Sequence, residues 1–593
     1  MSEAVQDFDF IMIKPSHYDD AGYPIVWWRT LLPSNSLAAL NGLARDAADR
    51  QVLGPNVRFN LTPIDECNTH VVPSKIVRKI RQRGSRALIG LVGVQSNQFP
   101  HALDLAREFR AAGLPVVIGG FHVSGTLSML KDIQPEVQEA LEIGCSIFAG
   151  ECEEGRLDTL FVDAWNGKLK PIYNYLKDLP NLTGVPAPWM SKESLDRNYG
   201  AWSSFDLGRG CPFQCSFCTI INVQGRKSRF RTADDLEGII RENIAQGIKA
   251  FFITDDNLAR NRHWEEFFDR LIKLREEEAL KANLTIQVDT LCHRIPNFID
   301  KAKRAGVTRA FVGLENINPD NLMAANKRQN KITEYRHLFQ QFHERGIFTL
   351  AGYILGFPGD TKDSILRDIE IIKRELPVDI LEFFFLTPLP GSEDHQKLYN
   401  AGVWMDPDLN KYDLHHRVSH HGTMSDQEWE ETYKAAWDSY FTWEHMETVT
   451  RRHARLQGGR PKKAMQYLIE FKLLYANEGV HTLEGGVARR KRRKSRRPSM
   501  PIEPALLFYP KFAYDSARKA WDYWRGFRRA KALVKRVSND PARWDYLDDA
   551  IRPLGDNELK AMDLFHETRG GEAAVAKIEQ QDAMIESVRA SAA

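Results

Sequence analysis

The chain has 593 residues, of which 43% are hydrophobic and 27% charged, and its formal net charge is +2. This length is sufficient for three or four domains, the composition is typical of a globular protein, and so small a net charge does not by itself indicate a nucleic-acid partner. The sequence contains no run of about eighteen apolar residues, so it predicts no transmembrane helix. The acidic N-terminus lacks the basic and then apolar pattern of a secretory signal, so we expect a cytoplasmic protein.

Residues 1–170 are predicted to form the first domain, because short apolar runs alternate with segments of helical periodicity. Helices are expected near residues 36–48, 75–83 and 101–113, and buried strands at ALIGLVGV, PVVIGG and SIFAG. Alternation of this kind predicts a doubly wound, Rossmann-like parallel sheet with helices on both faces.

Several small and polar residues follow the predicted strands of this domain. Ligands of such sheets bind outside the carboxyl ends of the strands, and glycines there let a backbone approach a ligand closely. Each of these residues could equally be an ordinary turn residue. The expected crevice residues are Ser96, Asn97, Gly119, Gly120, His122, Gly150 and Glu151.

Residues 171–200 are rich in proline and turn formers and are interpreted as a linker. From residue 201 to residue 400, strands and helices alternate again, and six strand-like runs can be placed between SFDLGRG and ILEFFFLTPL. Six such units predict a partial, open (β/α)6 version of the TIM barrel. In barrels of this kind the reactive groups lie on loops after the strands.

The loop after the first of these strands contains three cysteines in the spacing C-x3-C-x2-C, at Cys211, Cys215 and Cys218. Soft thiolates crowded this closely suit an iron–sulfur cluster better than a hard metal ion. A structural zinc site is the alternative, but no fourth cysteine or histidine follows for more than forty residues. Three ligands on a four-iron cluster would leave one iron open, and an open metal position is a place for chemistry.

Further polar residues and glycines come at the ends of the next strands. An acid in such a position is most often a helix cap or a salt-bridge partner, and a glycine there is most often part of a turn. The residues are Asp255, Asp256 and Asn257 after the second strand, Asp289 after the third, Glu315 after the fourth, and Gly352, Ile354 and Gly356 in the fifth.

The cysteine motif, with Phe217 before its last cysteine, resembles the radical S-adenosylmethionine (SAM) superfamily. The resemblance implies that a 4Fe-4S cluster binds SAM at its open iron and reduces it to a 5′-deoxyadenosyl radical. It also implies that residues 255–257 hold the SAM amino group, that Glu315 lies near the ribose or methionyl part, and that GYILGFPG passes beside the adenine. The match at residues 255–257 is loose, because acids replace the family's glycines.

The order GLVGVQSN, VVIGGFHVSG, FAGECEEG in the first domain is similar to the cobalamin-binding domain that precedes the cluster domain in one large class of this superfamily. TPLPGS, at residues 387–392, closes the last strand as it does in that class. The resemblance implies cobalamin as a third cofactor. However, the D-x-H-x-x-G motif that supplies a histidine to the cobalt is absent, and His70 has neither the aspartate nor the glycine that the motif requires.

Residues 401–480 are predicted to be a helical extension. Trp429, Tyr433 and Trp437 recur at helical spacing there and are expected to form core against the barrel. Residues 481–593 are predicted to be a basic and aromatic region with an acidic tail after residue 556, and eight of the nine residues 489–497 are Lys or Arg.

The same region continues with Trp521, Trp524 and Phe527 beside Arg525 and Arg528. Such a helix fits contact with an anionic membrane surface, at the inner face of the membrane. Binding of RNA and simple packing against the body of the protein are the alternatives, and nucleic acid is not the expected partner.

The leading hypothesis is therefore an enzyme that applies a deoxyadenosyl radical to an unactivated carbon, with methyl transfer preferred over an oxidative or ring-forming step. We expect a small-molecule or lipid substrate and, by resemblance, an external reductase of the flavodoxin or ferredoxin type. A carrier or sensor that binds cobalamin or an iron–sulfur cluster without catalysis is the hypothesis from another class. No catalytic residue can be named from the sequence.

Overall fold

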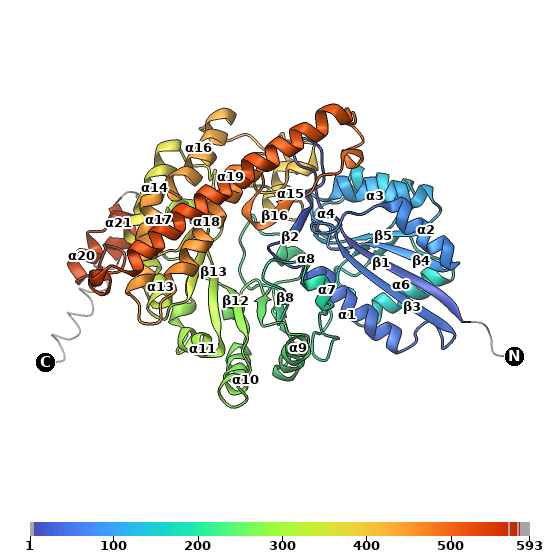
Figure 1. Ribbon diagram of the computed structural model, residues 1–593, viewed down its shortest axis with the longest axis horizontal. Helices are drawn as coiled ribbons and strands as arrows, with labels where there is room; N and C mark the ends of the chain where they lie inside the picture. Colours follow the sequence, from blue (N-terminus) through green and yellow to red (C-terminus); the bar gives the residue numbers. More distant parts are fainter. Residues whose placement is uncertain (1–4, 567–569, 578–579, 581–593) are drawn as a thin grey trace.

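The computed structural model describes residues 5–566, 570–577 and 580, so the end of the acidic tail lies outside the described residues. Figure 1 shows the N-terminal sheet and the barrel side by side, with the C-terminal helices against the barrel. Each half contains a six-stranded parallel sheet, and helices follow the barrel. The predicted fold class is confirmed.

The N-terminal sheet has the strand order β3-β1-β4-β5-β6-β7. The order reverses between β1 and β4, which is where sheets of this kind form a ligand crevice. β7 is formed by part of the segment that the sequence analysis interprets as a linker. The strands are β1 (Gln6–Lys14), β3 (Val57–Asp65), β4 (Arg86–Leu91), β5 (Val116–Gly119), β6 (Ser146–Ala149) and β7 (Ile172–Asn174).

Side chains of the central strand β1 alternate between two helical layers, because successive residues of a strand point to opposite faces. Phe10 packs edge-on against Phe161 of α6, with 4.9 Å between ring centroids, whereas Ile11 and Ile13 belong to the core on the other face. One layer contains α1 (Asn35–Asp49) and α6 (Arg156–Trp165), and the other contains α2 (Pro73–Arg83), α3 (Phe99–Ala111) and α5 (Pro135–Glu142).

The barrel sheet has the order β15-β14-β13-β12-β11-β8, and its two edges, β15 and β8, leave the barrel open. All six strands fall within the runs predicted from the sequence or overlap them. Helices such as α9 (Ala233–Ala245), α10 (Trp264–Glu276) and α14 (Lys362–Glu375) connect them. The strands are β8 (Trp202–Phe205), β11 (Ala250–Ile253), β12 (Asn283–Val288), β13 (Val307–Glu315), β14 (Phe348–Leu355) and β15 (Ile380–Phe385).

The C-terminal helices α16 (Asp426–Tyr440), α17 (Trp443–Arg455) and α18 (Pro461–Glu478) follow the barrel. Trp429 and Trp437 of α16 are buried, and Tyr433 stacks on Phe385 of β15 with 4.3 Å between ring centroids. The predicted aromatic core is confirmed. Successive side chains of a strand point to opposite faces. Because Phe385 points outward to α16, Phe384 points into the barrel.

After α18 the chain returns to the N-terminal half, where β16 (Gly486–Arg489) pairs antiparallel with β2 (Trp27–Thr30). Arg489 and Lys491 reach Asp19 at 3.0 and 2.7 Å, and Arg497 binds Asp408 with two hydrogen bonds. Much of the basic run therefore ties the chain to itself. The long helix α19 (Ala505–Ser538) then crosses the front of the molecule (Figure 1).

No helix in the described part of the chain is both long enough and apolar enough to cross a bilayer.

Candidate functional site

The three motif cysteines lie in the loop after β8. Cys215 is buried, and the amide of Gln329 donates to its Sγ at 3.5 Å, while the backbone N–H of Cys211 donates to the carbonyl of Gly225 at 3.3 Å. Burial raises the pKa of the Cys218 thiol to about 12. Among the described residues no three His, Cys, Asp or Glu side chains gather as ligands of one metal ion would. In a four-iron cluster each thiolate binds a different iron, so three cysteines spread over a loop suit it.

A lysine whose side chain is only 11% exposed lies beside these cysteines. Lys327 Nζ binds Glu315 Oε1 at 2.6 Å and lies 5.7 Å from the ring centre of Phe217. Burial lowers the pKa of Lys327, but Glu315 and the thiols of Cys215 and Cys218 raise it further, so the net pKa is above its ordinary value. A positive charge here stabilises thiolates. The sequence analysis missed Lys327, since an isolated loop lysine carries no pattern.

Two adjacent acids at the end of β11 differ in their surroundings. Asp255 accepts from the backbone N–H of Leu207 at 2.6 Å and so joins β11 to β8. Asp256 is half-buried, and among the described residues no side chain forms a hydrogen bond or ion pair with it. Burial raises the pKa of Asp255 to about 7, and burial together with Asp255 raises the pKa of Asp256 to about 7. A cationic group placed beside Asp256 would therefore be bound strongly.

The next predicted residue, Asp289 after β12, is already engaged. Arg260 forms two hydrogen bonds to its carboxylate, at 2.5 and 2.8 Å, and Asn257 Nδ2 donates to it at 2.8 Å. The same guanidinium lies 5.6 Å from the ring centre of Phe213 in the cysteine loop. Asp289 thus orients Arg260 against the cluster loop, a contact that the sequence did not indicate.

Glu315, at the end of β13, has a φ of 64°, in the left-handed region that non-glycine residues rarely adopt. The unusual conformation points its carboxylate to Lys327. In β14, a Cβ on Gly352 would lie 3.2 Å from Phe311 and from Phe384, both inside the barrel. Gly356 has a φ of 105°, and a Cβ there would lie 2.1 Å from the Trp429 ring, so this position requires glycine.

The barrel interior also contains a carboxylic acid without a partner. Glu382 of β15 pairs in register with Gly352 of β14 and is fully buried, and no residue in the described part of the chain forms a hydrogen bond with either of its carboxyl oxygens. Burial alone raises its pKa to about 8, so the side chain is neutral at pH 7. The sequence analysis missed Glu382, although a single charged residue in the apolar run ILEFFF was a usable signal.

The N-terminal sheet has a cavity of about 190 Å³ at its carboxyl edge. Of the predicted crevice residues, Gly119, Gly120, Gly150 and Glu151 line it, together with Ala39 and Leu40 of α1. A Cβ on Gly120, whose φ is 148°, would lie 2.1 Å from the backbone nitrogen of Val94, so only glycine fits. The cavity also reaches the cluster domain, which contributes Arg209, Val223 and Gln224.

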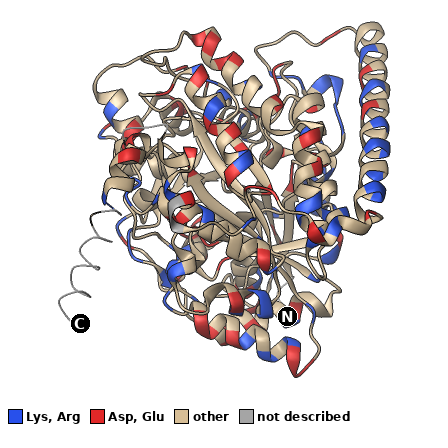
Figure 2. Cartoon of the chain, turned by 90° about the vertical axis from the view of Figure 1, so that its left-hand side faces the viewer, with Lys and Arg blue, Asp and Glu red and all other residues tan. Residues whose placement is uncertain are grey.

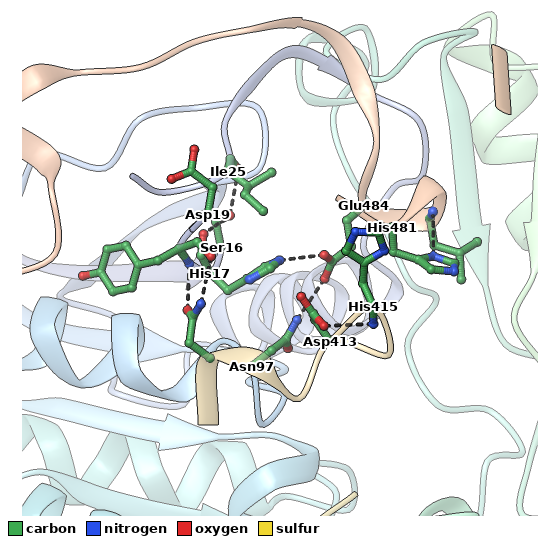
Figure 3. A network of polar contacts seen from close by, with 12 residues as sticks. Ser16, His17, Asp19, Ile25, Asn97, Asp413, His415, His481 and Glu484 are labelled. Carbon is green, nitrogen blue, oxygen red and sulfur yellow. Dashed lines mark hydrogen bonds and ion pairs between the residues drawn. The ribbon is translucent and has the colours of Figure 1, made fainter. Parts of the chain in front are cut away.

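Three other predicted crevice residues lie outside this cavity. His122 is buried and both ring nitrogens are engaged, Nδ1 with Ser96 Oγ at 3.1 Å and Nε2 with Glu136 at 3.0 Å. Asn97 donates to Glu484 Oε1 at 2.9 Å, and the other oxygen of Glu484 binds His17 Nε2 at 2.6 Å. Figure 3 shows Glu484 between these two residues, with Asp413 and His415 alongside.

A buried ion-pair network connects the cavity to the cluster loop. Arg209 lies two residues before Cys211, and its guanidinium binds Asp206, Glu151 and Glu153 at 3.1, 2.6 and 2.7 Å. Glu151 and Glu153 follow β6 of the N-terminal sheet, whereas Asp206 follows β8 of the barrel. The glycine-lined cavity and the cysteine loop are thus held as parts of one site.

Comparison with known proteins shows which families the chain is similar to. Residues 206–372 match the model of the radical SAM superfamily. The chain is 28% identical over 325 residues to bacteriochlorophyllide d C-12(1)-methyltransferase of Chlorobaculum tepidum, covering 53% of this chain and 66% of the relative. It is 26% identical over 381 residues to the C-8(2)-methyltransferase of that organism, covering 61% and 79%. It is 24% identical over 319 residues to hopanoid C-2 methylase of Rhodopseudomonas palustris, covering 54% and 58%.

Two solved structures have the same fold. The radical SAM methyltransferase TsrM from Kitasatospora setae, with cobalamin and a [4Fe-4S] cluster bound, has a TM-score of 0.51 at 17% identity, covering 68% of this chain and 80% of that one. The apo form of the cobalamin-dependent enzyme OxsB has a TM-score of 0.50 at 13% identity, covering 92% and 84%. Residues 206–372, which carry the cysteine loop on a partial barrel, therefore form a radical SAM domain, and the whole chain is similar to radical SAM methyltransferases and shares the fold of two solved cobalamin-dependent members of that superfamily.

Proposed function

We propose that this chain is a methyltransferase that combines radical SAM chemistry with cobalamin and acts on an unactivated carbon. When bound, a 4Fe-4S cluster would supply the electron that cleaves SAM, and cobalamin would carry the methyl group. The observation that carries the proposal is the single cavity lined both by the glycines of the N-terminal sheet and by residues of the cluster loop.

At the cluster, Cys211, Cys215 and Cys218 would hold three irons, and Lys327 would stabilise their thiolates. Asp256 is half-buried and has no side-chain partner among the described residues, and it interacts electrostatically with Cys211 and Cys218. It is therefore suited to bind the ammonium group of SAM beside the open iron. For the remaining residues we retain the assignments implied by the family: Asn257 at the amino group of SAM, Glu315 near the ribose or methionyl part, and Gly352, Ile354 and Gly356 beside the adenine. Asp289 is retained as a cofactor-binding candidate without a specific contact.

The cavity of the N-terminal domain would hold the cobalamin. Its walls are mostly backbone at the strand ends and apolar side chains such as Leu40 and Leu43, which suit a large, weakly charged ring system. No histidine lines it, and both nitrogens of His122 are engaged elsewhere. We propose that the cobalt receives no histidine from this chain.

The substrate is proposed as a lipid or another membrane-associated molecule. Relatives are named as methylases of a hopanoid and of bacteriochlorophyllides, both large and apolar. Two relatives named as anaerobic magnesium-protoporphyrin IX monomethyl ester cyclases, at 26 and 28% identity over less than 200 residues each, support ring formation as the alternative reaction. In either case the barrel must exclude water from the radical.

The electron would enter from outside the protein, and the surface beside the cluster loop suits an acidic donor. A hollow there is lined by Phe213, Arg226, Arg328 and Gln329, and Gln329 donates to Cys215 Sγ. Exposed arginines beside a redox centre favour docking of a flavodoxin or ferredoxin, whose surfaces are acidic.

The proposal is tested on protein that is purified and reconstituted without oxygen. Iron content and visible spectra are measured with and without hydroxocobalamin, and nucleoside products are measured after SAM and dithionite are added. Deoxyadenosine, S-adenosylhomocysteine and retained cobalt together would support methyl transfer. Deoxyadenosine without S-adenosylhomocysteine would favour the cyclase alternative. An intact cluster that leaves SAM unchanged would contradict catalysis and favour a carrier or sensor.

A further inference from the structure

Exposed apolar side chains are concentrated on one helix. Twenty large hydrophobic residues of the described chain are exposed, and eight of them lie between Ile502 and Phe527. Leu506 is 89% exposed, Tyr514 73% and Trp521 56%. Scattered apolar residues are normal on a protein surface, but a contiguous group marks a place of contact.

The orientation of α19 is fixed by its opposite face. Phe508, Ala530, Leu533 and Val537 are buried there, against α17, α18 and the N-terminal region. A Cβ on Gly526 would lie 2.9 Å from the side chain of Leu473, so the helices are in close contact. The exposed face therefore cannot be buried by a simple rotation of the helix.

The residue types on the exposed face of α19 change in a regular order along the helix. Leu507, Tyr514, Trp521, Arg528 and Lys535 recur every seven residues, which places them on one side of the helix. From the N-terminal to the C-terminal end, this stripe changes from aliphatic to aromatic and then to basic.

Neighbouring side chains reinforce the middle of this stripe. Trp524 stacks on Trp521 with 4.8 Å between ring centroids, and the guanidinium of Arg528 lies 4.7 Å from the Trp524 ring centre. Aromatic rings and cations thus form one continuous surface.

Most cations at this end of the helix are not used for internal ion pairs. Six Lys or Arg occur from Arg525 to Arg536, and no Asp or Glu interrupts them. Arg536 binds Glu447, but within the described chain Arg525, Arg528, Lys531 and Lys535 have no carboxylate partner. In contrast, Arg489 and Arg497 of the earlier basic run bind Asp19 and Asp408. Figure 2 shows the long helix with its Lys and Arg at the right-hand edge of the molecule.

We propose that this face of α19 docks on a bilayer that contains anionic phospholipids. The cations would contact lipid phosphates, the tryptophans would lie at the headgroup level, and Leu506 and Leu507 would reach the acyl boundary. RNA offers no apolar environment for the leucines. A second copy of the helix would bring like charges together. The inference depends on the surface and not on the proposed reaction, so either can fail alone.

Co-sedimentation of the full-length protein with vesicles tests this. We expect binding to phosphatidylcholine vesicles that contain about 30% phosphatidylglycerol, weaker binding to phosphatidylcholine alone, and partial loss in high salt. The double variant R528E/K535E should bind at least about 25-fold more weakly, at about fivefold for each basic residue removed. The variant W521S/W524S should bind about tenfold more weakly even in high salt.

The matched controls are W544S and K131E/K281E, which change an exposed tryptophan and exposed lysines outside α19 and should bind as the unmodified protein does. Unchanged thermal denaturation verifies that the α19 variants are folded. Absence of binding to anionic vesicles, or equal binding by α19 and control variants, would overturn the proposal. So would a dimer that the α19 variants convert to a monomer, because the stripe would then be a subunit interface.

Discussion

The two parallel sheets present opposite chemistry at the same kind of edge. The N-terminal sheet ends in glycines around a cavity with apolar walls, whereas the barrel sheet ends in carboxylates, of which Asp255 and Asp289 are buried and Asp256 and Glu315 are half-buried. Glycines make room for a large body, and carboxylates bind a small charged one. The sites proposed for cobalamin and for SAM thus differ in size and charge, and the buried Arg209 network connects them.

The largest expected effect is a variant that loses the ligand of the barrel edge and keeps the ligand of the N-terminal edge. Replacing Cys211, Cys215 and Cys218 by alanine should abolish iron binding and deoxyadenosine formation, because the cluster loses its ligands. Cobalamin binding at the other edge should persist. Iron analysis, product chromatography and cobalamin absorbance measure these. C145A, which alters a buried cysteine in the N-terminal domain, is the control. Iron retained by the triple variant would contradict the site.

Glu382 tests whether the neutral carboxyl group inside the barrel has a function. Its pKa of about 8 lies above the unfolded value near 4.5, so the folded state loses stability as pH rises between these values. E382Q should therefore be more stable by about 3 kcal/mol at pH 7 and equally stable below pH 4.5. Reduced turnover in this more stable variant would indicate contact with the substrate.

Thermal denaturation at several pH values measures the effect, and E375Q is its counterpart. Glu375 is also buried but accepts hydrogen bonds from the backbone N–H groups of Asp563 and Leu564, so E375Q should lose stability. If E382Q were less stable than the unmodified protein, Glu382 would have a stabilising partner and the argument from burial would fail.

A bulky side chain in the glycine-lined cavity should weaken ligand binding at the carboxyl edge of the N-terminal sheet. A39W places an indole in the cavity and should weaken cobalamin binding about thirtyfold, from about 2 kcal/mol of overpacking. Deoxyadenosine formation should be retained. D49W, at the exposed end of the same helix, is the control. Unchanged cobalt binding by A39W would mean that cobalamin binds elsewhere.

The smallest effect concerns delivery of electrons to the cluster. R226E/R328E should slow reduction by flavodoxin about two- to fivefold per charge, because surface pairs contribute little. Reduction by dithionite, which needs no docking, should not change. The ratio of the two rates is the measurement, and a loss with both reductants would indicate damage to the cluster loop instead.

Much of the fold could be predicted because its signals are local. The alternation of strands and helices, the six barrel runs and the aromatic core of α16 all follow from periodicity within short windows. β2 and β16 were not predicted. Each is four residues long, and among the described strands each pairs with the other alone, across most of the chain, which no local pattern encodes.

The site residues divide in the same way. The cysteine spacing and the crevice glycines Gly119, Gly120 and Gly150 could be found from sequence, because position along a strand determines where they lie. The partners of His122 and Asn97 could not, since side-chain pairing between consecutive helices leaves no periodic pattern for His122 and Glu136, and Glu484 lies 387 residues from Asn97. Lys327 and Arg260 were missed for the same reason.

The pairing of β2 with β16 has a consequence for synthesis. Trp27 donates to the carbonyl of Glu484, 457 residues further along the chain. At translation rates of about 5–20 residues per second, the ribosome needs roughly 23–90 s to deliver this partner. The N-terminal domain emerges early, with β2 unpaired and Trp27 exposed. An unpaired strand with an exposed apolar side chain can bind chaperones or aggregate. We expect the nascent chain to depend on a chaperone that holds it unaggregated until β16 has emerged from the ribosome.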